Sequence, residues 1–246
     1  MGYHWNWGIF LAQVPSGGTS YLGWMLSGLM TTLALSLSAW IIALVIGSAM
    51  GVLRTVPNRW LSGIGALYVE LFRNIPLLVQ LFIWYFVLPE LLPERLGNAY
   101  KEINPLLQQF TAAMICLGLF TGARVCEQVR SGIDSLPRGQ RLAGLALGLS
   151  GPQTYRYVLL PMAFRIIVPP LTSEFLNIFK NSAVASTIGL LELAAQGRQL
   201  VDYTAQPYES FIAVTLTFML LNALIMSLMH RLEARVRVPG QGGHHG

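Results

Sequence analysis

The sequence predicts an all-α protein that is integral to a membrane. Of its 246 residues, 54% are hydrophobic and only 11% are charged, whereas a soluble domain carries roughly 25% charged residues. A helix of ~20 apolar residues crosses the ~30 Å hydrocarbon core of a bilayer. Because no water is present there to satisfy an open strand edge, we expect the spanning elements to be helices. The longest stretches without Lys, Arg, Asp or Glu are residues 1–53, 103–123 and 210–230.

Apolar stretches and chain breakers divide the sequence into about five predicted spans. Prolines interrupt the second span at Pro76 and the fourth at Pro169 and Pro170. Gly47 and Gly51 in the first span favour the close approach of a neighbouring helix. The transmembrane domain is predicted over 21–232, with spans at 24–53, 67–87, 106–129, 155–190 and 208–232, an interfacial segment at 1–20 before it and a tail at 233–246 after it.

The basic residues predict the orientation of the chain. They gather after the first span, around the loop between the third and fourth spans, and after the fifth span, while the opposite loops are mainly acidic. The positive-inside rule then places the N-terminus in the periplasm and the C-terminus in the cytoplasm. It also accounts for the net charge of +5 without a nucleic-acid partner. Trp5, Trp7 and Phe10 are expected at the outer interface of the lipid bilayer, where amphipathic aromatic rings settle.

The predicted cytoplasmic loop between the third and fourth spans carries the most informative pattern. Residues 140–147 are rich in helix formers, Gly148 is expected to end that helix, and Pro152 is expected to open the next one. Leu142 and Leu145 belong to an apolar stripe at helical spacing. An exposed stripe of this kind needs a partner surface, which is either another protein or the lipid.

This loop resembles the EAA loop of bacterial ABC-importer permeases, which reads Glu-Ala-Ala, three residues, Gly, nine residues, then Ile-x-Leu-Pro. Gly148 and Pro161 match that pattern, whereas Leu142 stands at the usual Glu and Gly144 at the second Ala. The resemblance implies that the helix docks in a groove of an ATP-binding subunit and transmits its closure to the spans. The coupling loop is predicted over 138–153, and the implied coupling residues are Gln140, Leu142, Ala143, Gly144, Leu145, Gly148 and Pro161.

Three further segments, 70–80, 127–140 and 173–183, extend the resemblance to the permeases of polar amino-acid importers. The run 152–170 with the following 173–193 is most similar to the glutamate/aspartate members of that family. The resemblance implies a type I (MetI-like) permease fold in the bacterial inner membrane, with no cofactor on this chain and with ATP and Mg²⁺ on a partner. The implied partners are a cytoplasmic dimer of ATP-binding subunits, a second permease subunit that is a paralogue of this one, and a periplasmic amino-acid-binding protein.

Ionisable groups within the predicted spans suggest a substrate path. Such groups are costly in lipid and face a bundle interior or an aqueous cavity. Glu70 and Arg73 share a helix face and can pair, and Lys180 lies deep in the fourth span. An acidic amino acid would need cationic and N–H donor groups for its carboxylates. Packing and interhelical bonding is the alternative role for the candidate path residues, which are Arg73, Gln80, Glu174, Lys180, Asn181, Ser182 and Ser186.

No catalytic motif is found in the sequence. It contains no His-Glu-x-x-His, no Gly-x-Ser-x-Gly and no Walker loop, so an ATPase must lie on another chain. Cys116 and Cys126 are ten residues apart on one predicted helix, ~15 Å along its axis, which is too far for a disulfide. His244 and His245 are too few for a metal site. A channel or secondary transporter, or a membrane enzyme, remains the alternative, and each would act without an ATP-driven partner.

Overall fold

The computed structural model describes residues 3–15 and 17–236, and the regular elements in these ranges are all helices apart from one isolated bridge between Gln13 and Ser20. This confirms the all-α prediction. His244 and His245 lie outside the described residues, as do most of the predicted tail and residues 1, 2 and 16. The α-helices are α1 (Tyr21–Leu53), α2 (Arg59–Asn74), α3 (Leu77–Phe82), α4 (Leu88–Leu91), α5 (Glu94–Lys101), α6 (Pro105–Asp134), α7 (Arg138–Ala146), α8 (Gly151–Thr154), α9 (Leu160–Asn181), α10 (Leu193–Thr204) and α11 (Pro207–Val236). The other helical turns are the 3-10 helices η1 (Trp7–Leu11) and η4 (Ser182–Ile188) and the π-helical turns η2 (Ile83–Val87) and η3 (Tyr155–Leu159).

Among the described residues, four helical segments are long and apolar enough to cross a membrane: α1, α6, the stretch Gly151–Ile188 and α11. A fifth is added if α2 and the helices after it count as one interrupted span, which agrees with the expectation of about five. The interruption follows from Pro76, which precedes α3 and has an extended ψ of 140°. Proline lacks an N–H donor and disfavours the helical conformation of the residue before it, so α2 ends at Asn74.

The fourth predicted span differs from the expectation in where it is interrupted. Pro169 and Pro170 lie inside α9, which continues through them. The irregular turns lie on either side of α9: η3 ends at Leu159, two residues before Pro161, and η4 follows Asn181. A π-helical turn is a usual way for a helix to accommodate a missing backbone donor, and Pro161 supplies none to the carbonyl four residues earlier. Gly189 then ends the segment with a φ of +90°, in the left-handed region.

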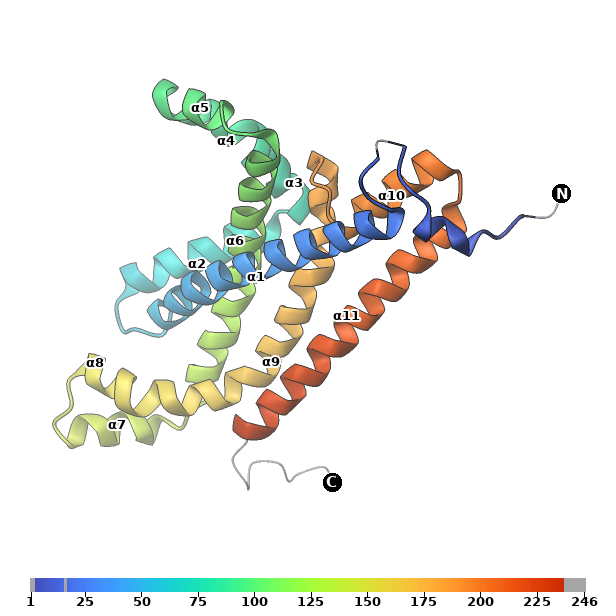
Figure 1. Cartoon of the computed structure of the whole chain (residues 1–246). Coiled ribbons are helices and arrows are strands. Elements are labelled where there is room, and N and C mark those ends of the chain that lie inside the picture. The colour runs from blue at the N-terminus through green and yellow to red at the C-terminus, as the bar shows by residue number, and fades with distance from the viewer. Residues whose placement is uncertain (1–2, 16, 237–246) are drawn as a thin grey trace. The chain divides into compact units, whose positions relative to one another are not determined.

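The chain divides into two compact units, of which the first comprises Met1–Ile41, Ile75–Gly118 and Asn177–Leu224. One of its apolar clusters is centred on Leu193 and Leu200 of α10, and the other contains Leu35 and Cys116. Figure 1 shows α10 beside the first part of α1. Gly28 allows this approach, since a Cβ there would lie 3.0 Å from the Leu193 Cα.

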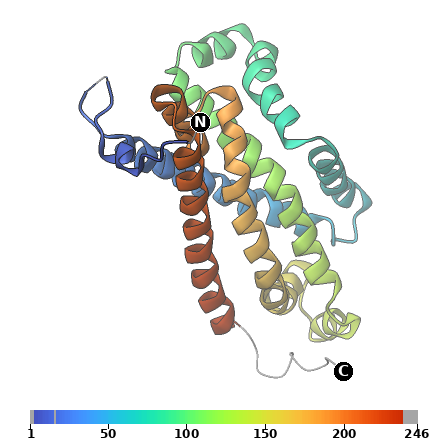
Figure 2. The same ribbon diagram turned by 90° about the vertical axis from the view of Figure 1, so that its right-hand side faces the viewer.

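The second unit comprises Ile42–Asn74, Leu119–Leu176 and Ile225–Gly246. Gly47 and Gly51 bring α1 against α6, where their absent Cβ atoms would lie 2.5 Å from the Gly122 carbonyl oxygen and 2.8 Å from the Cys126 carbonyl oxygen. The close approach predicted for this glycine pair is therefore confirmed. Later in α6, Gly132 allows the same helix to lie beside α9 (Figure 2).

Candidate functional site

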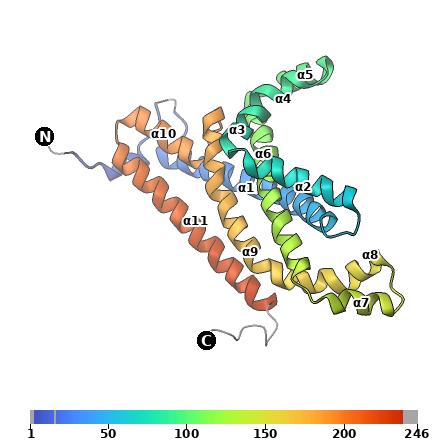
Figure 3. The ribbon, with the colours of Figure 1, turned by 180° about the vertical axis from the view of Figure 1, so that it is seen from behind.

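The loop between α6 and α9 forms a compact helical hairpin in the second unit. Figure 3 shows α7 and α8 lying side by side, and their contact is made at Gly144, which is buried. A Cβ on Gly144 would lie 2.8 Å from the Thr154 Cγ2 atom. This close contact explains why glycine stands at a position where the EAA pattern has alanine: a methyl group there requires Thr154 to move.

Both ends of the connection between α7 and α8 are capped. Gly148 has a φ of +81°, and its N–H donates to the Leu145 carbonyl while the Leu149 N–H donates to the Gly144 carbonyl. These two bonds form a Schellman motif. Ser150 and Gln153 then form a capping box at the start of α8, with the Ser150 N–H donating to the Gln153 Oε1 at 2.8 Å. The box was missed from the sequence, although Ser-x-x-Gln before an apolar run is its usual signal.

The predicted coupling residues differ in exposure and in what they contact. Leu142 and Leu147 are 65% and 82% exposed and, with Ala143, make an apolar outer face. Leu145 is 45% exposed and also lines a cavity beneath α7. The remaining predicted coupling residues lie elsewhere in the segment, with Gln140 half-buried in the first turn of α7 and Pro161 exposed in the first turn of α9.

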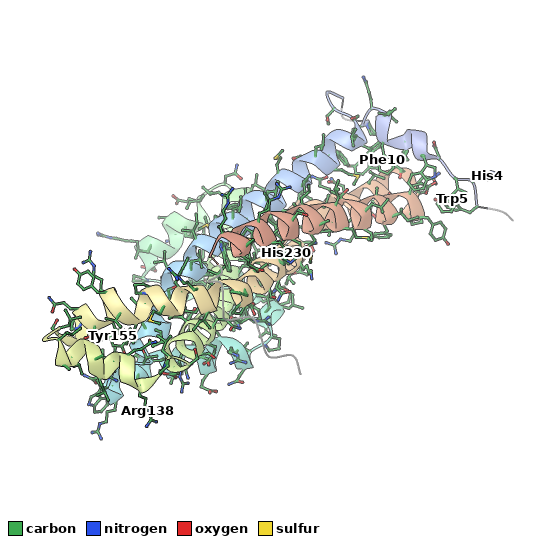
Figure 4. The ribbon with its side chains drawn as sticks, turned by 90° about the horizontal axis from the view of Figure 1, so that it is seen from below. His4, Trp5, Phe10, Arg138, Tyr155 and His230 are labelled. Carbon is green, nitrogen blue, oxygen red and sulfur yellow. The ribbon has the colours of Figure 1, made fainter. Side chains whose placement is uncertain are left out.

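Tyr155 anchors the hairpin to the segment that follows α1. Its hydroxyl donates to the Thr55 carbonyl oxygen at 2.8 Å, and it also lies 3.1 Å from the Thr55 Oγ1. Figure 4 shows Tyr155 on the helix next to the one that begins at Arg138. Nothing in the local sequence predicts this bond, since its partners are separated by 100 residues.

A polar cavity of about 280 Å³ lies elsewhere in the second unit, among α2, α6 and α9. It brings together Arg73 and Glu174, two of the predicted substrate-path residues. The Arg124 guanidinium approaches the Glu174 carboxylate at 3.6 Å and lies 5.0 Å from the centroid of the Phe120 ring. Glu127, which also lines the cavity, forms an ion pair with Arg54.

Arg124 and Gln128 were missed as members of this site. Arg124 was assigned only to the topology of the chain, yet it projects from the same helix face as Glu127 and Gln128, at the i, i+3 and i+4 spacing. That spacing of three polar groups within a spanning helix was the available signal. Glu70, which was expected to be able to pair with Arg73, accepts a hydrogen bond from the Asn74 side chain at 2.7 Å.

The other predicted path residues belong to the first unit, whereas the polar cavity belongs to the second. Gln80 is buried, and its amide donates to the Ile75 carbonyl at 2.8 Å across the break before α3. The Ser182 and Ser186 hydroxyls donate to carbonyls three residues earlier, at 2.7 and 2.6 Å. Lys180 is exposed in the last turn of α9, and Asn181, half-buried, follows it.

Two acidic residues that the sequence placed in outer loops are fully buried in the first unit. Glu192 caps α10 by accepting the N–H groups of Ala194 and Ala195 at 3.0 and 2.8 Å, and burial raises the pKa of its carboxyl group. Glu209, in the first turn of α11, accepts hydrogen bonds from the Tyr3 hydroxyl and from the Asn6 N–H. These carboxylates hold the scaffold together rather than form a site.

Comparison with known proteins identifies the family. Residues 43–238 match the model of the binding-protein-dependent transport system inner membrane component. The chain is 62% identical over 244 residues to the glutamate/aspartate import permease protein GltJ of Escherichia coli (strain K12), with 99% of each chain covered. It is 30% identical over 214 residues to the glutamine transport system permease protein GlnP of the same strain, covering 87% of this chain and 93% of that protein.

Solved structures agree with this family. A chain from the crystal structure of an amino acid ABC transporter with histidines superposes with a TM-score of 0.74 at 28% identity, over 87% of this chain and 95% of that one. A chain from the inward-facing MetNI methionine ABC transporter has the same TM-score at 23% identity, over 88% and 98% of the two chains, which supports the fold. The chain therefore belongs to the family of binding-protein-dependent transport system inner membrane components, the permease subunits of ABC importers, which reside in the inner membrane and rely on a separate ATPase subunit.

Proposed function

We propose that this chain is the permease subunit of an ATP-driven importer for glutamate and aspartate. The observation that carries the substrate assignment is the 62% identity over 99% of the chain to a glutamate/aspartate import permease. Alternating access is driven by ATP and Mg²⁺ on a dimer of cytoplasmic ATP-binding subunits. A periplasmic amino-acid-binding protein delivers the substrate, and a second permease subunit, paralogous to this one, completes the path.

The hairpin of α7 and α8 is the proposed docking element for the ATP-binding subunit. Its exposed apolar outer face, made by Leu142, Ala143 and Leu147, supplies the contact. Its caps and the buried contact at Gly144 supply the stiffness that lets a movement of the partner reach α9. This assignment uses the predicted orientation, which places the hairpin in the cytoplasm together with the C-terminus.

The polar cavity is the proposed contact with the substrate. Glutamate and aspartate each carry two carboxylates and one ammonium group. The guanidinium groups of Arg73 and Arg124 match the carboxylates, and Glu174 matches the ammonium. The separation of 3.6 Å between Arg124 and Glu174 is longer than a hydrogen bond, so neither group is saturated by the other. Gln80, Lys180, Asn181, Ser182 and Ser186 are proposed to line the part of the path in the first unit.

Reconstitution in liposomes tests this function. The chain is purified with its ATP-binding subunit and second permease subunit, and uptake of radiolabelled glutamate is measured with and without the binding protein and ATP. We expect uptake only when all components are present, with competition by unlabelled aspartate and little by unlabelled glutamine. Flux through the chain alone would instead indicate a channel or a secondary transporter, and competition by glutamine alone would move the substrate assignment to another polar amino acid.

A further inference from the structure

Two apolar cavities of the second unit share part of their walls. The larger, about 720 Å³, lies along α1 and α9 and is walled by aliphatic and aromatic side chains such as Leu44 and Phe164. The smaller, about 460 Å³, lies beneath α7 and η3. Val52 and Leu160 line both cavities. Because they share these two walls, we take the two cavities together and call them the hairpin groove, which extends from α1 and α9 to the α7–α8 hairpin.

The hairpin end of this groove is basic. Arg141 of α7 and Arg156 of η3 line the smaller cavity, and no Asp or Glu stands among its described lining residues. The ion pairs found among the described residues involve neither arginine. The Arg156 guanidinium lies 5.6 Å from the centroid of the exposed Tyr157 ring. An apolar groove that ends in two guanidinium groups is complementary to a ligand with an apolar chain and an anionic head.

We propose that the hairpin groove binds an anionic phospholipid, with an acyl chain in its apolar part and the phosphate between Arg141 and Arg156. Guanidinium groups match phosphate oxygens bidentately, and basic pockets between spanning helices on the cytoplasmic side suit anionic head groups. The groove reaches the spanning helices, so a lipid can enter it from the bilayer without passing through water.

The polar groups of the groove favour a lipid over an acidic peptide or a free phosphate. A peptide backbone needs donors and acceptors, yet the Thr154 hydroxyl already donates to the Ser150 carbonyl and the Tyr155 hydroxyl to the Thr55 carbonyl. A free phosphate would use the two arginines but leave the apolar wall uncovered. An acyl chain demands no hydrogen bonds and covers that wall.

A lipid bound at this site would lie between the α7–α8 hairpin and the end of α1. The smaller cavity is lined by Leu145 of α7, by Val52 in the last turn of α1, and by Val56 and Pro57 in the segment that follows α1. A bound acyl chain would fill the space between the hairpin and the end of α1. The Tyr155–Thr55 hydrogen bond joins the hairpin to the segment after α1 in the same region. The proposal concerns neither the substrate nor the polar cavity, so it stands or falls separately from the function proposed above.

Native mass spectrometry of the assembled importer, purified in detergent, tests the site with phosphatidylglycerol and with phosphatidylcholine of the same acyl chains. We expect selective retention of phosphatidylglycerol, and binding weakened by about tenfold or more in the double variant Arg141→Gln/Arg156→Gln. The matched control Arg138→Gln/Arg165→Gln removes two basic charges from exposed positions of α7 and α9 that do not line the groove, and it should bind as the unaltered importer does.

The variant Leu160→Trp tests the apolar part independently, because it fills the wall shared by both cavities and leaves the charges in place. We expect it to reduce phosphatidylglycerol binding several-fold while free inorganic phosphate, titrated as a second probe, shows no comparable affinity. Equal retention of the two phospholipids would overturn the proposal, as would binding that the control double variant and the Arg141/Arg156 double variant weaken equally. Binding of inorganic phosphate as tight as that of phosphatidylglycerol would reduce the site to an anion site and also overturn it.

Discussion

The α7–α8 hairpin and the polar cavity both belong to the second unit, but different forces hold them. The hairpin is closed by local bonds: the Schellman motif at Gly148, the capping box at Ser150 and the contact of Gly144 with Thr154. The polar cavity is formed by charged groups from three helices whose pairing is incomplete, as the long Arg124–Glu174 separation shows. A structure closed by short-range bonds moves as one body, whereas incompletely paired charges exchange partners when a ligand arrives.

This contrast suggests different roles for the hairpin and the polar cavity in transport. Under the proposed function, a rigid hairpin would transmit the movement of a docked subunit without absorbing it. Under the proposed function, a cavity with unsaturated charges would bind a zwitterion and release it when the helices that carry Arg73, Arg124 and Glu174 separate. Damage to the hairpin should therefore abolish assembly and transport together, while damage to the cavity should alter transport alone.

The largest effect is expected from Gly144→Leu. The new side chain would occupy the space of Thr154, and overpacking of this kind costs about 1–3 kcal/mol. We expect the hairpin to open, co-purification of the ATP-binding subunit to fail and ATP-driven uptake to be lost. Circular dichroism should still report a helical chain, because the spanning helices do not depend on this contact.

Gly139→Leu is the matched control for that variant. Gly139 lies in the same helix, and a Cβ at its position meets nothing within 4 Å. The control should assemble and transport normally. If Gly144→Leu retained the ATP-binding subunit and uptake as the control does, the hairpin would not be the rigid docking element described above.

A second, smaller effect is expected from Arg124→Gln. Removing a charge-assisted contact costs about 1.5–3 kcal/mol, which corresponds to a loss of roughly tenfold or more in apparent affinity. We expect the KM for glutamate uptake to rise by this factor while the ATP-binding subunit still co-purifies. Arg130→Gln removes the same charge from α6 at a site where the guanidinium pairs with exposed Asp134, and it should leave the KM unchanged. A rise in KM in both variants would indicate a general effect of charge.

The same contrast explains what the sequence could predict. The end of α7, which comes at Ala146 directly before the turn at Leu147 and Gly148, and the start of α8 near Pro152 depend on local residues, and both predictions were confirmed. The role of Gly144 could not be derived, because the atom that excludes a methyl group belongs to Thr154, ten positions later. Arg124 resembled any basic residue at the end of a span, because Glu174 of α9 and Arg73 of α2 come near it only after the helices pack.

The smallest effect is expected from Gly148→Ala, which tests how much of the hairpin's stiffness resides in its turn. Gly148 has a φ of +81° and no neighbour that a methyl group would touch, so the cost is conformational only, about 1–2 kcal/mol for a non-glycine residue in the left-handed region. We expect the ATP-binding subunit to bind and uptake to fall a few-fold, with less transport per ATP hydrolysed. Gly151→Ala, also without a neighbour within 4 Å and with an ordinary φ, should have no such effect. If Gly148→Ala changed neither uptake nor the ratio of transport to hydrolysis, the stiffness would have to come from the Gly144–Thr154 contact and the Tyr155–Thr55 bond alone.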